Sequence, residues 1–96
     1  MFIVTNTTSN GEYTPSLFND KRKAYEWFYS LIVNNLIDAK GDSIPADIKD
    51  SRDGVLSWGL EKGYLERESE NRYALLYNPY ETDVQTISIY EVEVSD

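Results

Sequence analysis

Apolar residues recur along the chain with two different spacings, and each spacing predicts a different kind of element. In the first half of the chain they return every three or four residues, which is the repeat of one helix face. Near both ends of the chain they alternate with polar residues or form short β-branched runs, which favours strands. The pattern therefore predicts a domain that contains both helices and a sheet.

The most regular helical pattern predicts a helix over residues 19–39. Asn19 is the expected N-cap, Asp20 suits the first turn, and Gly41 lies where a C-terminal stop belongs. The apolar stripe consists of Ala24, Trp27, Phe28, Leu31, Ile32 and Leu36.

A second, shorter helix is predicted to begin after Ser51 and to end at Gly63. Tyr64 would then pack back on Trp58 in a Schellman arrangement. Two glycines inside this helix weaken it by up to about 1 kcal/mol each relative to Ala. If both are helical, they allow a close approach by the first helix or by the sheet. These glycines are Gly54 and Gly59.

Strands are predicted on both sides of the helices. Residues 1–5 carry apolar side chains on both faces, which indicates a central or covered strand. A short partner strand is expected at 12–14, ended by Pro15. Residues 64–68 and 72–77 are expected to form a hairpin with a three-residue loop.

The last strand, expected at about 84–94, has apolar residues on opposite sides in its two halves. Ile87 and Ile89 share one side, whereas Tyr90, Val92 and Val94 share the other. Side chains alternate strictly along a strand, so either a bulge lies near Ile89 and Tyr90 or the two halves pack against different layers. Together the segments predict one α+β domain over residues 1–96, with an antiparallel or mixed sheet of about four or five strands and two helices on one face.

The composition excludes several classes of catalytic and metal-binding site. The chain contains neither Cys nor His, so it lacks thiol nucleophiles, thiolate metal sites and the commonest general base. No catalytic motif and no calcium-binding loop is present. We therefore expect no enzyme activity, no cofactor and no metal. No segment is long and apolar enough to span a bilayer, and no signal peptide is recognisable, so a cytoplasmic protein without membrane contact is expected.

Net charge indicates the kind of partner. Asp and Glu number 17 against nine Lys and Arg, a formal charge of -8. This balance repels nucleic acid, so no direct nucleic-acid binding is expected, and it favours the basic surface of another protein. The alternative is that the acidic residues only keep a small protein soluble.

Carboxylates on the predicted strands are the first candidate binding residues. Glu66, Glu68 and Glu70 fall on one face of the hairpin, and Glu91 and Glu93 fall on one face of the last strand. If these strands are neighbours, the carboxylates form a negative surface that fits a groove built for phosphates. The alternative is a solvated sheet face or a charged edge that resists aggregation.

Tyrosines are the second candidate. The chain has eight, too many for so small a core, and tyrosine is favoured at interfaces. The tyrosines predicted to contact a partner are Tyr64, Tyr73 and Tyr77.

The profile of small size, acidity, missing Cys and His, and many tyrosines resembles small acidic inhibitors encoded by bacteriophages, such as anti-CRISPR and anti-restriction proteins. The resemblance implies an inhibitor that blocks a host nuclease or another nucleic-acid-binding defence protein, by nucleic-acid mimicry or by holding an inactive state. Two alternatives remain open: an assembly subunit or homo-oligomer paired through a strand edge, and an acidic winged-helix regulator built on residues 51–77. A monomer and a homodimer are both compatible with the sequence.

Overall fold

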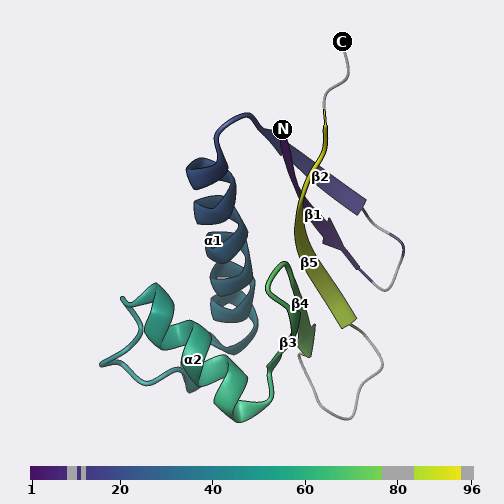
Figure 1. Ribbon diagram of the computed structural model, residues 1–96. Helices are drawn as coiled ribbons and strands as arrows, with labels where there is room; N and C mark the ends of the chain where they lie inside the picture. The colour runs from purple at the N-terminus through teal and green to yellow at the C-terminus, as the bar shows by residue number, and fades with distance from the viewer. Residues whose placement is uncertain (9–10, 12, 77–83, 94–96) are drawn as a thin grey trace.

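The predicted fold class is confirmed by the computed structural model, which describes residues 1–8, 11, 13–76 and 84–93 (Figure 1). Two α-helices accompany a five-stranded sheet in which every pairing is antiparallel. In chain order the elements are β1 (Phe2–Thr7), β2 (Tyr13–Phe18), α1 (Lys21–Lys40), the 3-10 helix η1 (Gly41–Ser43), α2 (Arg52–Lys62), β3 (Leu65–Ser69), β4 (Arg72–Leu76) and β5 (Val84–Glu91).

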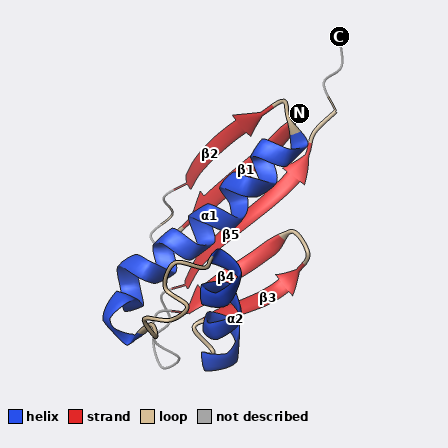
Figure 2. Cartoon of the chain, turned by 90° about the vertical axis from the view of Figure 1, so that its left-hand side faces the viewer, coloured by secondary structure: helices blue, strands red, loops and turns tan. Residues whose placement is uncertain are grey.

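The strand order is β2-β1-β5-β4-β3, so the first and last strands of the chain are neighbours in the middle of the sheet. This confirms the central position predicted for the N-terminal strand. Helix α1 lies across one face of the sheet, and α2 packs against α1 and β3 (Figure 2). No helix among the described residues is long and apolar enough to cross a membrane.

The helix boundaries agree with the predicted ones, with one correction. Asp20, and not Asn19, caps α1: its carboxylate accepts hydrogen bonds from the backbone N–H groups of Arg22 at 2.8 Å and Lys23 at 3.3 Å. A carboxylate in this position also offsets the unfavourable placement of basic residues at a helix N-terminus.

Helix α2 begins and ends as predicted. The hydroxyl of Ser51 accepts a hydrogen bond from the N–H of Gly54 at 3.1 Å. Gly63 adopts the left-handed conformation with φ 79°, and the N–H of Tyr64 donates to the carbonyl of Gly59 at 2.9 Å. The ring of Tyr64 then lies 5.4 Å from that of Trp58, which is the expected Schellman contact.

Two predicted strand boundaries were wrong. Strand β2 does not stop at Pro15 but continues to Phe18. It lies at the edge of the sheet, where a residue without an N–H is tolerated. The hairpin loop has two residues and not three, because Ser69 pairs with Arg72 and a register shift follows Arg67.

Strand β5 resolves the two alternatives left open by its sequence. Its register with β1 is unbroken from Glu91 to Thr86, so no bulge is present there. Ile87 and Ile89 are buried, whereas Tyr90 is exposed. Ile87 and Ile89 therefore lie on the opposite face of the sheet from Tyr90, and Val94 lies outside the described residues.

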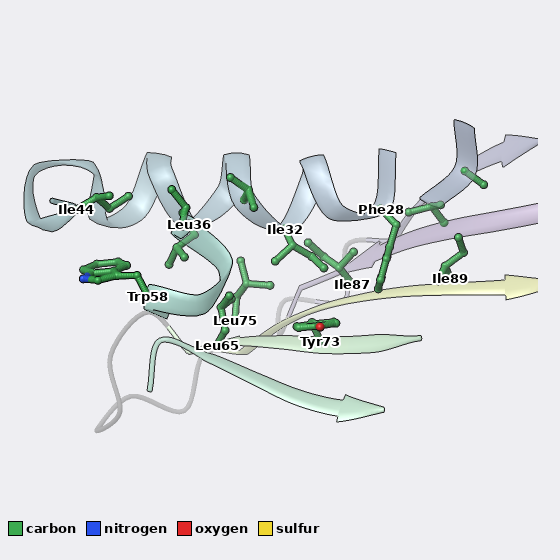
Figure 3. Packing of buried hydrophobic residues seen from close by; sticks show 14 residues of the cluster. Phe28, Ile32, Leu36, Ile44, Trp58, Leu65, Tyr73, Leu75, Ile87 and Ile89 are labelled. Carbon is green, nitrogen blue, oxygen red and sulfur yellow. The ribbon is translucent and has the colours of Figure 1, made fainter. Parts of the chain in front are cut away.

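The hydrophobic core lies between α1 and the sheet (Figure 3). Phe28 is fully buried at its centre, with its ring centroid 5.1 Å from Tyr29 and 5.9 Å from Tyr73. Tyr73 is only 4% exposed, and burial raises the pKa of its hydroxyl above the usual value. Tyr73 is thus a core residue that a partner cannot reach, which corrects its prediction as a binding residue.

A network of side-chain amides ties α1 to the sheet at the opposite end from the α1 N-terminus. The Nε2 group of Gln85 donates to Oδ1 of Asn6 at 2.7 Å and to Oδ1 of Asn35 at 3.1 Å. Asn35 in turn donates to the carbonyl of Leu31 at 2.7 Å. These bonds satisfy polar groups next to the core, so they hold α1 on one particular face of the sheet.

Candidate partner-binding surface

The face of the sheet opposite α1 is not covered by either described helix, and we call it the uncovered face (Figure 2). Its side chains form three rows that cross the strands from β2 towards β3, since antiparallel partners stand side by side. The rows are Leu17–Ile3–Tyr90, Pro15–Thr5–Ser88–Arg72, and Tyr13–Thr7–Thr86–Ala74–Glu66.

Large apolar side chains gather on the β2, β1 and β5 part of this face. Of the seven large hydrophobic side chains that are exposed among the described residues, five lie here, with exposed fractions from 36% to 62%. Together with half-buried Ile3 they form what we call the apolar patch. Its members are Met1, Ile3, Tyr13, Leu17, Tyr90 and Val92. Exposed apolar side chains gathered in this way are typical of interaction sites.

The chain ends extend the patch beyond the strands. The amino group of Met1 donates to the carbonyl of Val92 at 3.3 Å, and the N–H of Val92 donates back to the carbonyl of Met1 at 2.8 Å. This reciprocal pair continues the β1–β5 ladder. It places both side chains on the same side of the sheet as Ile3 and Tyr90, because side chains alternate along each strand.

Two tyrosine hydroxyls meet within the patch. The hydroxyl oxygens of Tyr13 and Tyr90 lie 3.4 Å apart, although the residues come from β2 and β5 with β1 between them. The hydrogen bond with Tyr90 is the main cause that raises the pKa of the Tyr13 hydroxyl above its usual value. The pair adds ring area and two polar atoms to an otherwise apolar surface.

Among the described residues, charged side chains on the uncovered face lie on the β3–β4 side. The positions of β2, β1 and β5 on this face carry no charged residue. Glu66 of β3 ends its row, and Arg72 of β4 lies next to Ser69 of β3. Glu68 is bound to Arg72, with 2.9 Å between Oε2 and Nε.

Both edges of the sheet resist pairing with another strand. Met1 and Val92 form a hydrogen-bonded pair, and such pairs alternate with non-hydrogen-bonded pairs along an antiparallel ladder. The backbone groups of odd-numbered residues of β1 therefore bond to β5, and those of even-numbered residues bond to β2. Tyr13, Pro15 and Leu17 consequently direct their backbone groups outwards, and Pro15 has no N–H to offer. At the other edge, β3 is interrupted by its register shift and carries consecutive charged residues.

Replacing Pro15 with Thr should make β2 competent for pairing with a second copy. The substitution restores the missing outward N–H and adds a residue that favours strands. Sedimentation velocity should detect concentration-dependent self-association of this variant. Thr14→Val serves as the control, since Thr14 lies opposite Asn6 at a position whose backbone groups point inwards. A Pro15→Thr variant that sediments like the unchanged protein would contradict the assignment.

The predicted carboxylates do not form one continuous surface. Glu66 lies on the uncovered face, Glu68 lies at the register shift and is bound to Arg72, and Glu70 lies in the β3–β4 turn. Glu91 pairs with Phe2 and shares the helix-covered side with Ile89, and Glu93 follows the end of β5. Strand β4 also separates β3 from β5. The two groups are thus on different strands and different faces, which corrects the expected single surface.

The tyrosine predictions have different outcomes. Tyr64 is half-buried at the end of α2, with Lys40 Nζ 4.9 Å from its ring centroid, and lies away from the apolar patch. Tyr77 falls outside the described residues. Sequence reasoning missed Leu17 because the predicted strand ends at Pro15, and it missed Tyr13 because the contact of Tyr13 with Tyr90 depends on the strand order. The sequence did indicate Tyr90, because it lies on the side of the last strand opposite Ile87 and Ile89 and that side is also apolar.

Other candidate sites have little support among the described residues. No group of three or more acidic side chains is placed to hold a metal ion in that part of the chain. An open depression at the end of α1 is lined by one consecutive segment, residues 37–43. The hairpin after α2 is not a free wing, because β4 pairs with β5.

Comparison of the chain with protein-family models, curated proteins and solved structures finds no match.

Proposed function

We propose that this protein is a non-enzymatic binding module that attaches to a basic, nucleic-acid-binding protein in the cytoplasm and inhibits it. The apolar patch on the uncovered face is the observation that carries the proposal. Binding surfaces combine an apolar, uncharged centre with aromatic anchors, and the patch offers both through Leu17, Tyr13 and Tyr90.

Charge favours a basic partner over a second copy of the chain. The protein carries a formal charge of -8, so two copies repel one another, whereas a basic protein is attracted over a distance. The blocked strand edges argue against edge pairing as well. Nucleic-acid-binding proteins supply the basic surface, and the resemblance to acidic phage inhibitors supports this choice.

A capture experiment with a matched pair of variants tests the proposal. Leu17→Asp places a charge at the most exposed residue of the patch, while Leu60→Asp makes the same change at an exposed leucine of α2 that is 37% accessible. The tagged protein and both variants are incubated with bacterial lysate, and retained proteins are identified by mass spectrometry. Urea unfolding of each variant verifies that it is folded.

The unchanged protein and Leu60→Asp should retain the same basic nucleic-acid-binding protein, and Leu17→Asp should lose it by at least about tenfold, equivalent to about 1.4 kcal/mol. Adding the unchanged protein should prevent the captured protein from binding its nucleic acid, and salt should weaken the complex. Equal capture by both variants would refute the proposed surface. A dimer that Leu17→Asp converts to a monomer would instead favour the homo-oligomer.

A further inference from the structure

We infer that the partner's contact surface is apolar at its centre and basic along one side only, the side that meets the β3–β4 hairpin. This inference rests on the proposed function and specifies the partner of the same surface. It follows from how charge is distributed along the three rows of the uncovered face.

The first and third rows begin with a large side chain without charge on β2 and lead to an acidic side chain at the β3–β4 hairpin. The first row starts at Leu17 and reaches Tyr90, and the N–H of Ile89 donates to the carbonyl of Asn71 at 2.9 Å. That bond places the β3–β4 turn, with Glu70, alongside the end of this row. The third row starts at Tyr13 and ends at Glu66.

The available negative charge on this side comes from two carboxylates. Glu68 is compensated by Arg72, so the pair contributes little net charge. Glu66 and Glu70 are exposed and take part in neither of the ion pairs found among the described residues. A cation of a bound partner is attracted to such exposed carboxylates, and salt weakens this attraction.

On the opposite side of the patch, the residues that the structure describes offer no comparable carboxylates. The uncovered side of β2 presents Tyr13, Pro15 and Leu17, all of them uncharged. Glu91 lies on the other face of the sheet and cannot reach a partner seated on the patch. The described carboxylates therefore favour the orientation in which a bound partner has its Arg or Lys residues over the hairpin.

Two synthetic amphipathic peptides serve as defined probes. Both carry the same leucine face, and one has Arg along a single flank where the other has Glu. Binding is followed by changes in the amide NMR spectrum of the isotope-labelled full chain. The Arg peptide should shift the amides of Ile3, Leu17 and Tyr90 together with those of Glu66 and Glu70, and the Glu peptide should bind at least about tenfold more weakly.

Two double variants with the same change in net charge provide the decisive comparison. Glu66→Lys with Glu70→Lys should weaken the Arg peptide at least about tenfold, while Glu91→Lys with Glu93→Lys should weaken it less than about twofold. Equal losses would show that only net charge matters and would overturn the inference, as would the absence of binding by the Arg peptide. If Leu17→Asp abolishes capture of the natural partner while the hairpin variant retains it, the proposed function stands and the one-sided contact fails.

Discussion

Replacing Phe28 with Ala is expected to lower the free energy of unfolding by about 3–5 kcal/mol. The Phe28 ring is fully buried and packs edge-to-face against Tyr29 and Tyr73, with centroid distances of 5.1 and 5.9 Å. Truncation removes these contacts and leaves a cavity between α1 and the sheet, which the surrounding strands cannot close. Since a small domain is stable by only about 5–15 kcal/mol, this single change removes a large share of it.

Trp27 provides the matched control, because it is the neighbouring aromatic residue on the same helix and is 39% exposed. Trp27→Ala should cost clearly less than Phe28→Ala in urea unfolding followed by far-UV circular dichroism. The Phe28 variant is measured at low temperature and in a stabilising buffer, so that its transition remains visible. Similar losses in both variants would contradict the position of the core.

Gly59→Val is expected to destabilise the protein by about 2–3 kcal/mol through overpacking. A Cβ atom on Gly59 would lie 2.6 Å from Cδ2 of Leu36 on α1 and 2.9 Å from Cδ1 of Leu65 on β3. Both leucines are buried, so neither can move aside without disturbing its own contacts. The absence of a side chain at this position is therefore what lets α2 approach α1 and β3 closely.

Gly41→Val tests whether the effect is specific to that contact. A Cβ atom on Gly41 would meet no atom within 4 Å, and its φ of -52° suits any residue. This variant should stay within about 0.5 kcal/mol of the unchanged protein in thermal or urea unfolding. A Gly59 variant as stable as the Gly41 variant would refute the close approach of the three elements.

The helix boundaries could be predicted because they depend on neighbours in the sequence. A capping side chain such as Ser51 bonds to a backbone N–H three residues away, and Gly63 ends α2 through its own backbone conformation. The N-cap of α1 was predicted at Asn19, whereas the structure has it at Asp20. Both side chains can accept hydrogen bonds from a helix N-terminus, so the position at which the helix begins depends on how α1 packs on the sheet.

The candidate surface could be predicted only in part. Apolar residues on both sides of the first and last strands indicated that each strand has two apolar faces, and the structure places these strands side by side. The role of Pro15 was misjudged, because a proline is compatible with a strand only at a free edge, and edge position is a property of the whole sheet.

The amino-acid sequence by itself determined the acidity of the chain, the absence of Cys and His chemistry, the two helices, the N-cap and C-terminal glycine of α2, and the alternation of side chains along each strand. Those properties depend on composition or on residues a few positions apart. Only the tertiary structure decided which strands are neighbours and which sheet face α1 covers. These two facts separate Glu66 from Glu91 and bring Tyr13 beside Tyr90, because contacts between residues far apart in the chain arise from the packing of the whole domain.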